Sequence, residues 1–180
     1  MRPTPDQIGR ALPHVRYEIE SLLLTPVYNQ SDAALQESVY FRRMAHCRVL
    51  YAFFTKPASS RTRAGDDDVL CEDFGFPAQT LYGEDAGFLL ARFNKDLFHL
   101  TYARLERTAA TKPWPMGSLF PPVCKRSKMF IEHVLKSSSL KIPDAELKYW
   151  KDLINAATNR SPLQQNTSNV ATHETALLVF

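Results

Sequence analysis

Apolar side chains recur along this chain every three or four residues, which is the spacing of helices that bury one face. Before the first such stretch, Thr4 and Gln7 have the spacing of a capping box, and Pro5 suits a first helical position. The expected inward positions of this helix are Ile8, Leu12, Val15, Ile19, Leu22 and Leu23. Pro13 predicts either a kink or a later start, and Thr25-Pro26 predicts the end.

A second helix is predicted over residues 33–55, after a run of cap-forming residues at 29–32. It carries two apolar stripes on different sides. The first stripe contains Leu35, Val39, Arg42, His46, Val49, Leu50 and Phe53, and the second contains Phe41, Met44, Cys47 and Tyr51. A helix that is apolar on two sides usually lies centrally in a bundle.

Three more helices are predicted: one over residues 84–108, one from Pro121-Pro122 to 136, and a short one from Pro143. No alternating strand pattern persists. The sequence therefore predicts an all-α, up-and-down bundle of four main helices in a single domain over residues 1–158. Its long 56–83 connection is expected to be mobile at 59–65 and to dock on the bundle at 69–74. Residues 159–180 are expected to form a polar, weakly ordered tail.

The composition is that of a soluble globular protein, with 44% apolar and 23% charged residues among 180. The net charge of +3 permits an anionic partner without requiring one. The sequence contains neither an amino-terminal signal-peptide pattern nor an apolar run of about 18 residues, so no membrane partner is expected. Three cysteines without a CxxC pair predict reduced thiols in a cytoplasmic protein.

Arg92 and His99 are the candidate catalytic residues. They are seven positions apart in the predicted 84–108 helix, so they share one face, opposite the apolar stripe around Leu97. A guanidinium can grip a phosphate and a histidine can transfer a proton, which suffices for metal-independent RNA cleavage. The alternative is an ordinary solvated face on which Asp96 pairs with either residue.

His46 is predicted to be a buried structural residue, because it lies in the middle of an apolar stripe. Its expected partners are carboxylates of the 66–73 segment or amide and hydroxyl groups of the 94–101 segment, and Arg42 is expected to pair with the same acids. The predicted structural polar cluster comprises His46, Arg42, Asp67, Asp68, Asp73, Asn94 and Thr101.

No metal or small-molecule cofactor is predicted. His46, Cys71, Asp73, Cys124 and His133 could supply metal ligands, but no pair has a recognised zinc spacing and no di-iron repeat is present. Phosphate loops and dinucleotide fingerprints are also absent. The basic cluster at residues 125–128 is either a solvated face or a contact for a nucleic-acid backbone.

The Arg92-x6-His99 spacing, late in a helical bundle, is similar to the Arg-x4–6-His signature of HEPN domains. This resemblance implies a helical bundle that dimerises, with the two motifs meeting at the interface, and a metal-independent ribonuclease activity of the toxin or defence type. A second resemblance covers about residues 33–105, through His46, Asp67-Asp68-Val69, Asp73-Phe74, Asn94-Lys95 and His99-Leu100-Thr101. It is to a group of uncharacterised bacterial helical proteins and implies no activity.

Two functional hypotheses follow. In the first, the chain is a HEPN-like ribonuclease, or an inactive nucleotide-binding relative, with RNA and a second copy as its partners. In the second, it is a non-enzymatic helical interaction or scaffold protein, and the polar cluster is structural.

Overall fold

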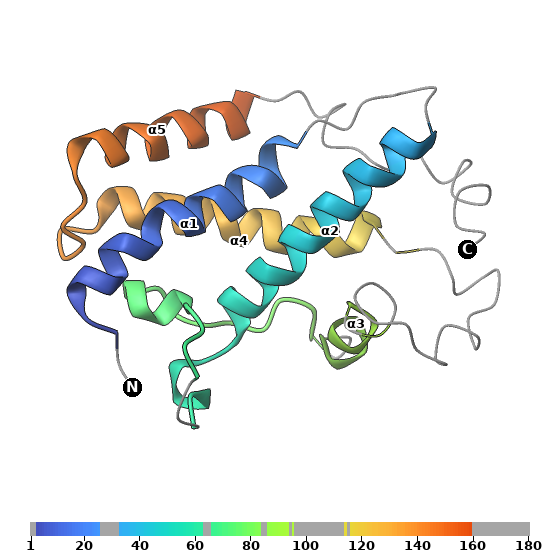
Figure 1. The fold of residues 1–180 in the computed structure, drawn as a ribbon, viewed down its shortest axis with the longest axis horizontal. Helices are drawn as coiled ribbons and strands as arrows, with labels where there is room; N and C mark the ends of the chain where they lie inside the picture. The colour runs from blue at the N-terminus through green and yellow to red at the C-terminus, as the bar shows by residue number, and fades with distance from the viewer. Residues whose placement is uncertain are drawn as a thin grey trace.

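The computed structural model describes residues 3–25, 33–62, 66–83, 86–93, 95, 114 and 116–159, which form helices and connecting segments without a strand (Figure 1). The all-α prediction is confirmed. The long helices are α1 (Pro5–Leu24), α2 (Ala33–Thr55), α4 (Met116–Lys136) and α5 (Asp144–Asn159), and the short elements are η1 (Ala58–Ser60), η2 (Cys71–Phe74) and α3 (Ala86–Arg92). Among the described helices, none combines the length and the hydropathy that crossing a bilayer requires.

The start of α1 is fixed by the predicted capping box. The backbone N–H of Gln7 donates to Thr4 Oγ1 at 3.2 Å, and the N–H of Thr4 donates to Gln7 Oε1 at 2.8 Å. Pro5 takes the first helical position, where its missing N–H would have no helical partner. The helix continues through Pro13, which lies on the exposed side.

The helix α2 has the predicted bounds, but its buried side lies between the two stripes and draws on both. The buried apolar residues are Met44, Cys47, Leu50, Tyr51, Phe53 and Phe54. The outer members of the stripes face outward instead: Leu35 is 43% exposed, Phe41 50% and Val49 43%. A helix that packs against two neighbouring helices buries the side chains that lie between its contacts with them. This explains why the buried side of α2 contains residues of both stripes.

The long helices form two antiparallel pairs, α1 with α2 and α4 with α5, and α1 and α2 also contact α4 (Figure 1). In Figure 1, α1 and α5 run from left to right, whereas α2 and α4 run from right to left. The fifth helix is longer than the short one predicted, with 16 residues. Of the predicted 84–108 helix, the structure describes α3, Phe93 and Lys95, so the up-and-down order through this helix stays a prediction. The tail after residue 159 also lies outside the described residues.

The helix α4 begins five positions before its predicted start, and Pro121 and Pro122 lie inside it. A proline in a helix cannot donate to the carbonyl four residues earlier, and its ring pushes against that carbonyl. Beside this turn, Tyr82 Oη donates to the carbonyl of Leu119 at 2.6 Å. The prediction that the two prolines mark the amino-terminal end was therefore wrong.

The centre of the core is an aromatic cluster around Phe130 of α4, whose side chain is fully buried. Its ring centroid lies 5.2 to 6.0 Å from those of Phe53, Phe54, Phe74, Phe76 and Trp150. These rings come from α2, the connection and α5, so one side chain ties together elements far apart in the sequence.

The connection between α2 and α3 docks on the bundle, as expected for residues 69–74. Cys71 and Phe74 are buried, and the ring nitrogen Nε2 of His133 hydrogen-bonds with the Phe74 carbonyl at 2.8 Å. A second anchor is Arg126, which donates to the Pro77 carbonyl. The connection therefore lies against α4 through both backbone and side-chain contacts.

Candidate functional site

Arg92, the candidate catalytic arginine, is the last residue of α3 and is 5% exposed. The carbon at the centre of its guanidinium lies 4.3 Å from the centroid of the Trp114 ring. The ring of the fully buried Phe93 lies 5.5 Å from the same tryptophan. The expectation that Arg92 points away from the apolar side is therefore wrong, because a flat guanidinium can stack on an aromatic face and be buried there.

The residues before and after Arg92 do match the predicted orientation. Phe88 is 55% exposed and Lys95 is exposed, whereas Leu89 is buried. His99, the second candidate catalytic residue, lies outside the described residues, and so do Asn94 and Thr101. The geometry of the Arg92–His99 pair therefore stays a prediction.

His46 is hydrogen-bonded to a carboxylate, but that carboxylate belongs to α1. Its Nδ1 lies 2.7 Å from Glu18 Oε2, and the two side chains are 14% and 26% exposed. The ring of Tyr17 meets the imidazole edge-on at a centroid distance of 5.6 Å. Arg42 donates to Ser21 Oγ at 3.4 Å. The expected pairing of His46 and Arg42 with the 66–73 segment is therefore wrong, because α1 packs against this side of α2.

The Glu18–His46 pair has one feature of an acid–base site. A carboxylate that accepts from Nδ1–H leaves the lone pair on Nε2, which is the form a general base uses. Among the described residues, however, no hydroxyl or thiol is hydrogen-bonded to this imidazole, and the nearby Ser21 hydroxyl accepts from Arg42. The contact therefore acts as a polar link between two helices.

We expect His46→Ala to lower the free energy of unfolding by about 1–2 kcal/mol, because Glu18 would lose its partner while partly buried. Urea denaturation would measure the change, with the exposed His14→Ala of α1 as the matched control. If the interaction is pairwise, Glu18→Gln should cost much less in the His46→Ala background than in the wild type. Equal costs in both backgrounds would contradict it.

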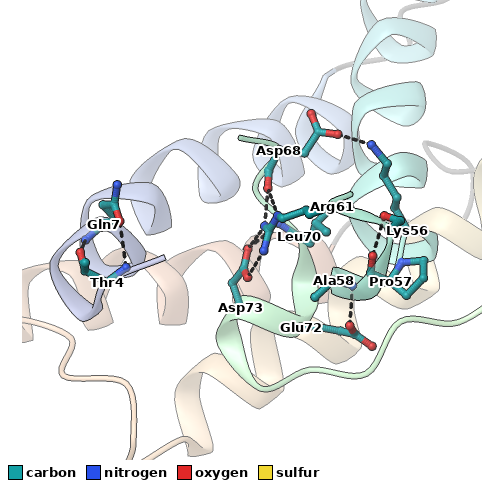
Figure 2. A network of polar contacts seen from close by, with 11 residues as sticks. Thr4, Gln7, Lys56, Pro57, Ala58, Arg61, Asp68, Leu70, Glu72 and Asp73 are labelled. Carbon is teal, nitrogen blue, oxygen red and sulfur yellow. Dashed lines mark hydrogen bonds and ion pairs between the residues drawn. The ribbon is translucent and has the colours of Figure 1, made fainter. Parts of the chain in front are cut away.

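The acidic residues of the connection form a network centred on Arg61 (Figure 2). Arg61 Nη1 and Nη2 donate to the two carboxylate oxygens of Asp73 at 2.8 and 2.5 Å, and the guanidinium also donates to the Asp68 carbonyl. Asp73 Oδ2 accepts from the Leu70 N–H at 2.9 Å. The Arg61 and Asp73 side chains are 7% and 6% exposed. This bidentate pair closes the connection into a compact loop.

The rest of the network lies nearer the surface. Glu72 Oε2 accepts from the Ala58 N–H at 2.7 Å, and Lys56 forms an ion pair with Asp68 (Figure 2). Asp67 of the predicted polar cluster is exposed. In the 59–65 segment that is expected to be mobile, residues 59 and 60 lie in η1 and Arg61 forms its ion pair with Asp73, so the mobility of this segment stays a prediction. Residues 63–65 lie outside the described part.

Sequence reasoning missed Arg61, which lies in the 59–65 segment that is expected to be mobile. The sequence contained one signal for this ion pair: Arg61 lies twelve positions before Asp73, at the other end of a loop that contains several acidic residues. The hydrogen bonds that Arg61 donates to Asp73, together with the charge of that carboxylate, hold the pKa of Arg61 above its usual value. This arginine is therefore a fixed structural cation.

The cysteines and the candidate metal ligands are structural as well. Burial raises the pKa of Cys71 to about 11 and raises that of Cys47 further, whereas an activated thiol nucleophile needs a lowered pKa. Cys71 Sγ lies 3.8 Å from the Phe54 carbonyl, and His133 is bound to the connection. Within the described ranges, no three side chains of histidine, cysteine, aspartate or glutamate gather in a way that could hold a metal ion.

The basic cluster at residues 125–128 is largely built into the fold. Arg126 is 5% exposed, with its guanidinium 4.0 Å from the Phe76 ring centroid. Lys128 Nζ donates to the Ala157 carbonyl at 3.2 Å and so links α4 to α5. Lys125 is exposed. This arrangement differs from the solvated row of cations that binds a nucleic-acid backbone.

The described residues of the candidate catalytic pair and of the predicted polar cluster do not form one site. Arg92 lies on Trp114 at the end of α3, His46 lies between α1 and α2, and Asp68 and Asp73 lie within the connection. Comparisons of the chain with models of protein families, with curated proteins and with solved structures gave no match.

Proposed function

We propose that this chain is a helical interaction protein in which the polar cluster is structural. The observation that carries the proposal is the burial of Arg92 against Trp114. An arginine that binds a phosphate has to present its N–H donors to the ligand. Because Arg92 is 5% exposed, little of its donor surface is accessible to a ligand. The Glu18–His46 and Arg61–Asp73 contacts support the same view, since each holds two segments of the chain together.

The surface supports an interaction role. Large apolar or aromatic side chains remain about half exposed on α1, α2 and α5, among them Tyr17 (54%), Phe41 (50%) and Tyr149 (53%). Tyrosine and phenylalanine are enriched in protein–protein interfaces, where their rings supply contact area at a small cost in side-chain entropy. Exposed rings of this kind suit a protein partner better than a phosphate backbone.

A pair of measurements tests this proposal. We expect the purified chain to leave labelled single-stranded RNA intact in the presence of EDTA. We also expect Arg92→Gln to lower the free energy of unfolding by about 1–2 kcal/mol, because the guanidinium would no longer stack on Trp114. Cleavage by the wild type, or an Arg92→Gln variant as stable as the wild type, would contradict the structural role.

The second candidate is the HEPN-like, metal-independent ribonuclease, acting on RNA as a homodimer. In this proposal Arg92 stabilises charge on the phosphorane, and His99 transfers the proton. The observation that favours it is Phe88, 55% exposed and one turn before Arg92 on α3. An exposed ring beside an arginine can stack on an unpaired RNA base.

The same RNA assay separates the two candidates. A ribonuclease should cleave with EDTA present, and His99→Ala should abolish cleavage while the circular dichroism spectrum stays unchanged. The matched control is His14→Ala, an exposed histidine on α1, which should keep full activity. Arg92→Lys should lose most activity, because lysine cannot reproduce the bidentate fork.

A further inference from the structure

We draw no further inference here: the strongest candidate, the surface patch where the guanidinium of Arg16 on α1 lies over the half-exposed ring of Tyr149 on α5, carries none, because nothing in the structure shows what covers it.

Discussion

Replacing Arg61 with alanine is expected to lower the free energy of unfolding by about 3 kcal/mol. The guanidinium and the Asp73 carboxylate are 7% and 6% exposed, so removing the cation leaves a buried, unpaired negative charge. The Leu70 N–H would remain as a donor to that carboxylate but would not neutralise it. The loss should appear as a lower urea midpoint with an unchanged slope.

The connection supplies its own control for this prediction. Lys56 pairs with Asp68 in the same segment, but these side chains are 42% and 58% exposed, so Lys56→Ala should cost less than about 1 kcal/mol. Removing both Arg61 and Asp73 should cost less than the sum of the single changes, because no unpaired charge is left. An Arg61→Ala variant as stable as Lys56→Ala would show that the pair contributes no more than a surface contact.

Phe130→Ala is expected to cost about 3–5 kcal/mol, the range for removing a large aromatic side chain from a core. The ring is fully buried and lies within 6.0 Å of five other aromatic rings, counted between centroids, so its removal leaves a cavity that these rings cannot easily fill. Thermal and urea denaturation would both measure the change.

The neighbouring Met129 is the matched control for this substitution. It lies on the same helix but is 44% exposed, so Met129→Ala should change stability by a few tenths of a kcal/mol. Similar losses for the two variants would mean that the cluster around Phe130 is not the centre of the core.

Local signals in the sequence were sufficient for much of the fold. The capping box at Thr4 sets the start of α1, and the bounds of α2 follow from its apolar spacing. Both signals depend on contacts within a few residues, which a sequence displays directly. Pro121 shows where local signals fail. Proline prefers the first turn of a helix, but Pro121 lies inside α4, where tertiary packing holds the helix around it.

The polar partners were harder to predict because they depend on which elements become neighbours. The position of His46 in a stripe indicated a contact with another element, but the choice between Glu18 and the acidic connection depends on where α1 packs. Arg61 was missed since its partner is reached only after the connection folds back on itself. The burial of Arg92 depends in the same way on Trp114, a residue 22 positions further along the chain.

The docking of the connection on α4 also has a consequence for the order of folding. The α1–α2 and α4–α5 pairs each join helices adjacent in the described chain, whereas the His133–Phe74 and Arg126–Pro77 anchors span 59 and 49 positions. Closing such long loops costs more entropy than closing a helical hairpin, so the anchors are expected to form after the hairpins. Until that late step, Phe53 and Phe54 of the first hairpin lack the partner ring that Phe130 of α4 contributes. The newly formed hairpin is therefore the stage at which this chain is most prone to aggregate.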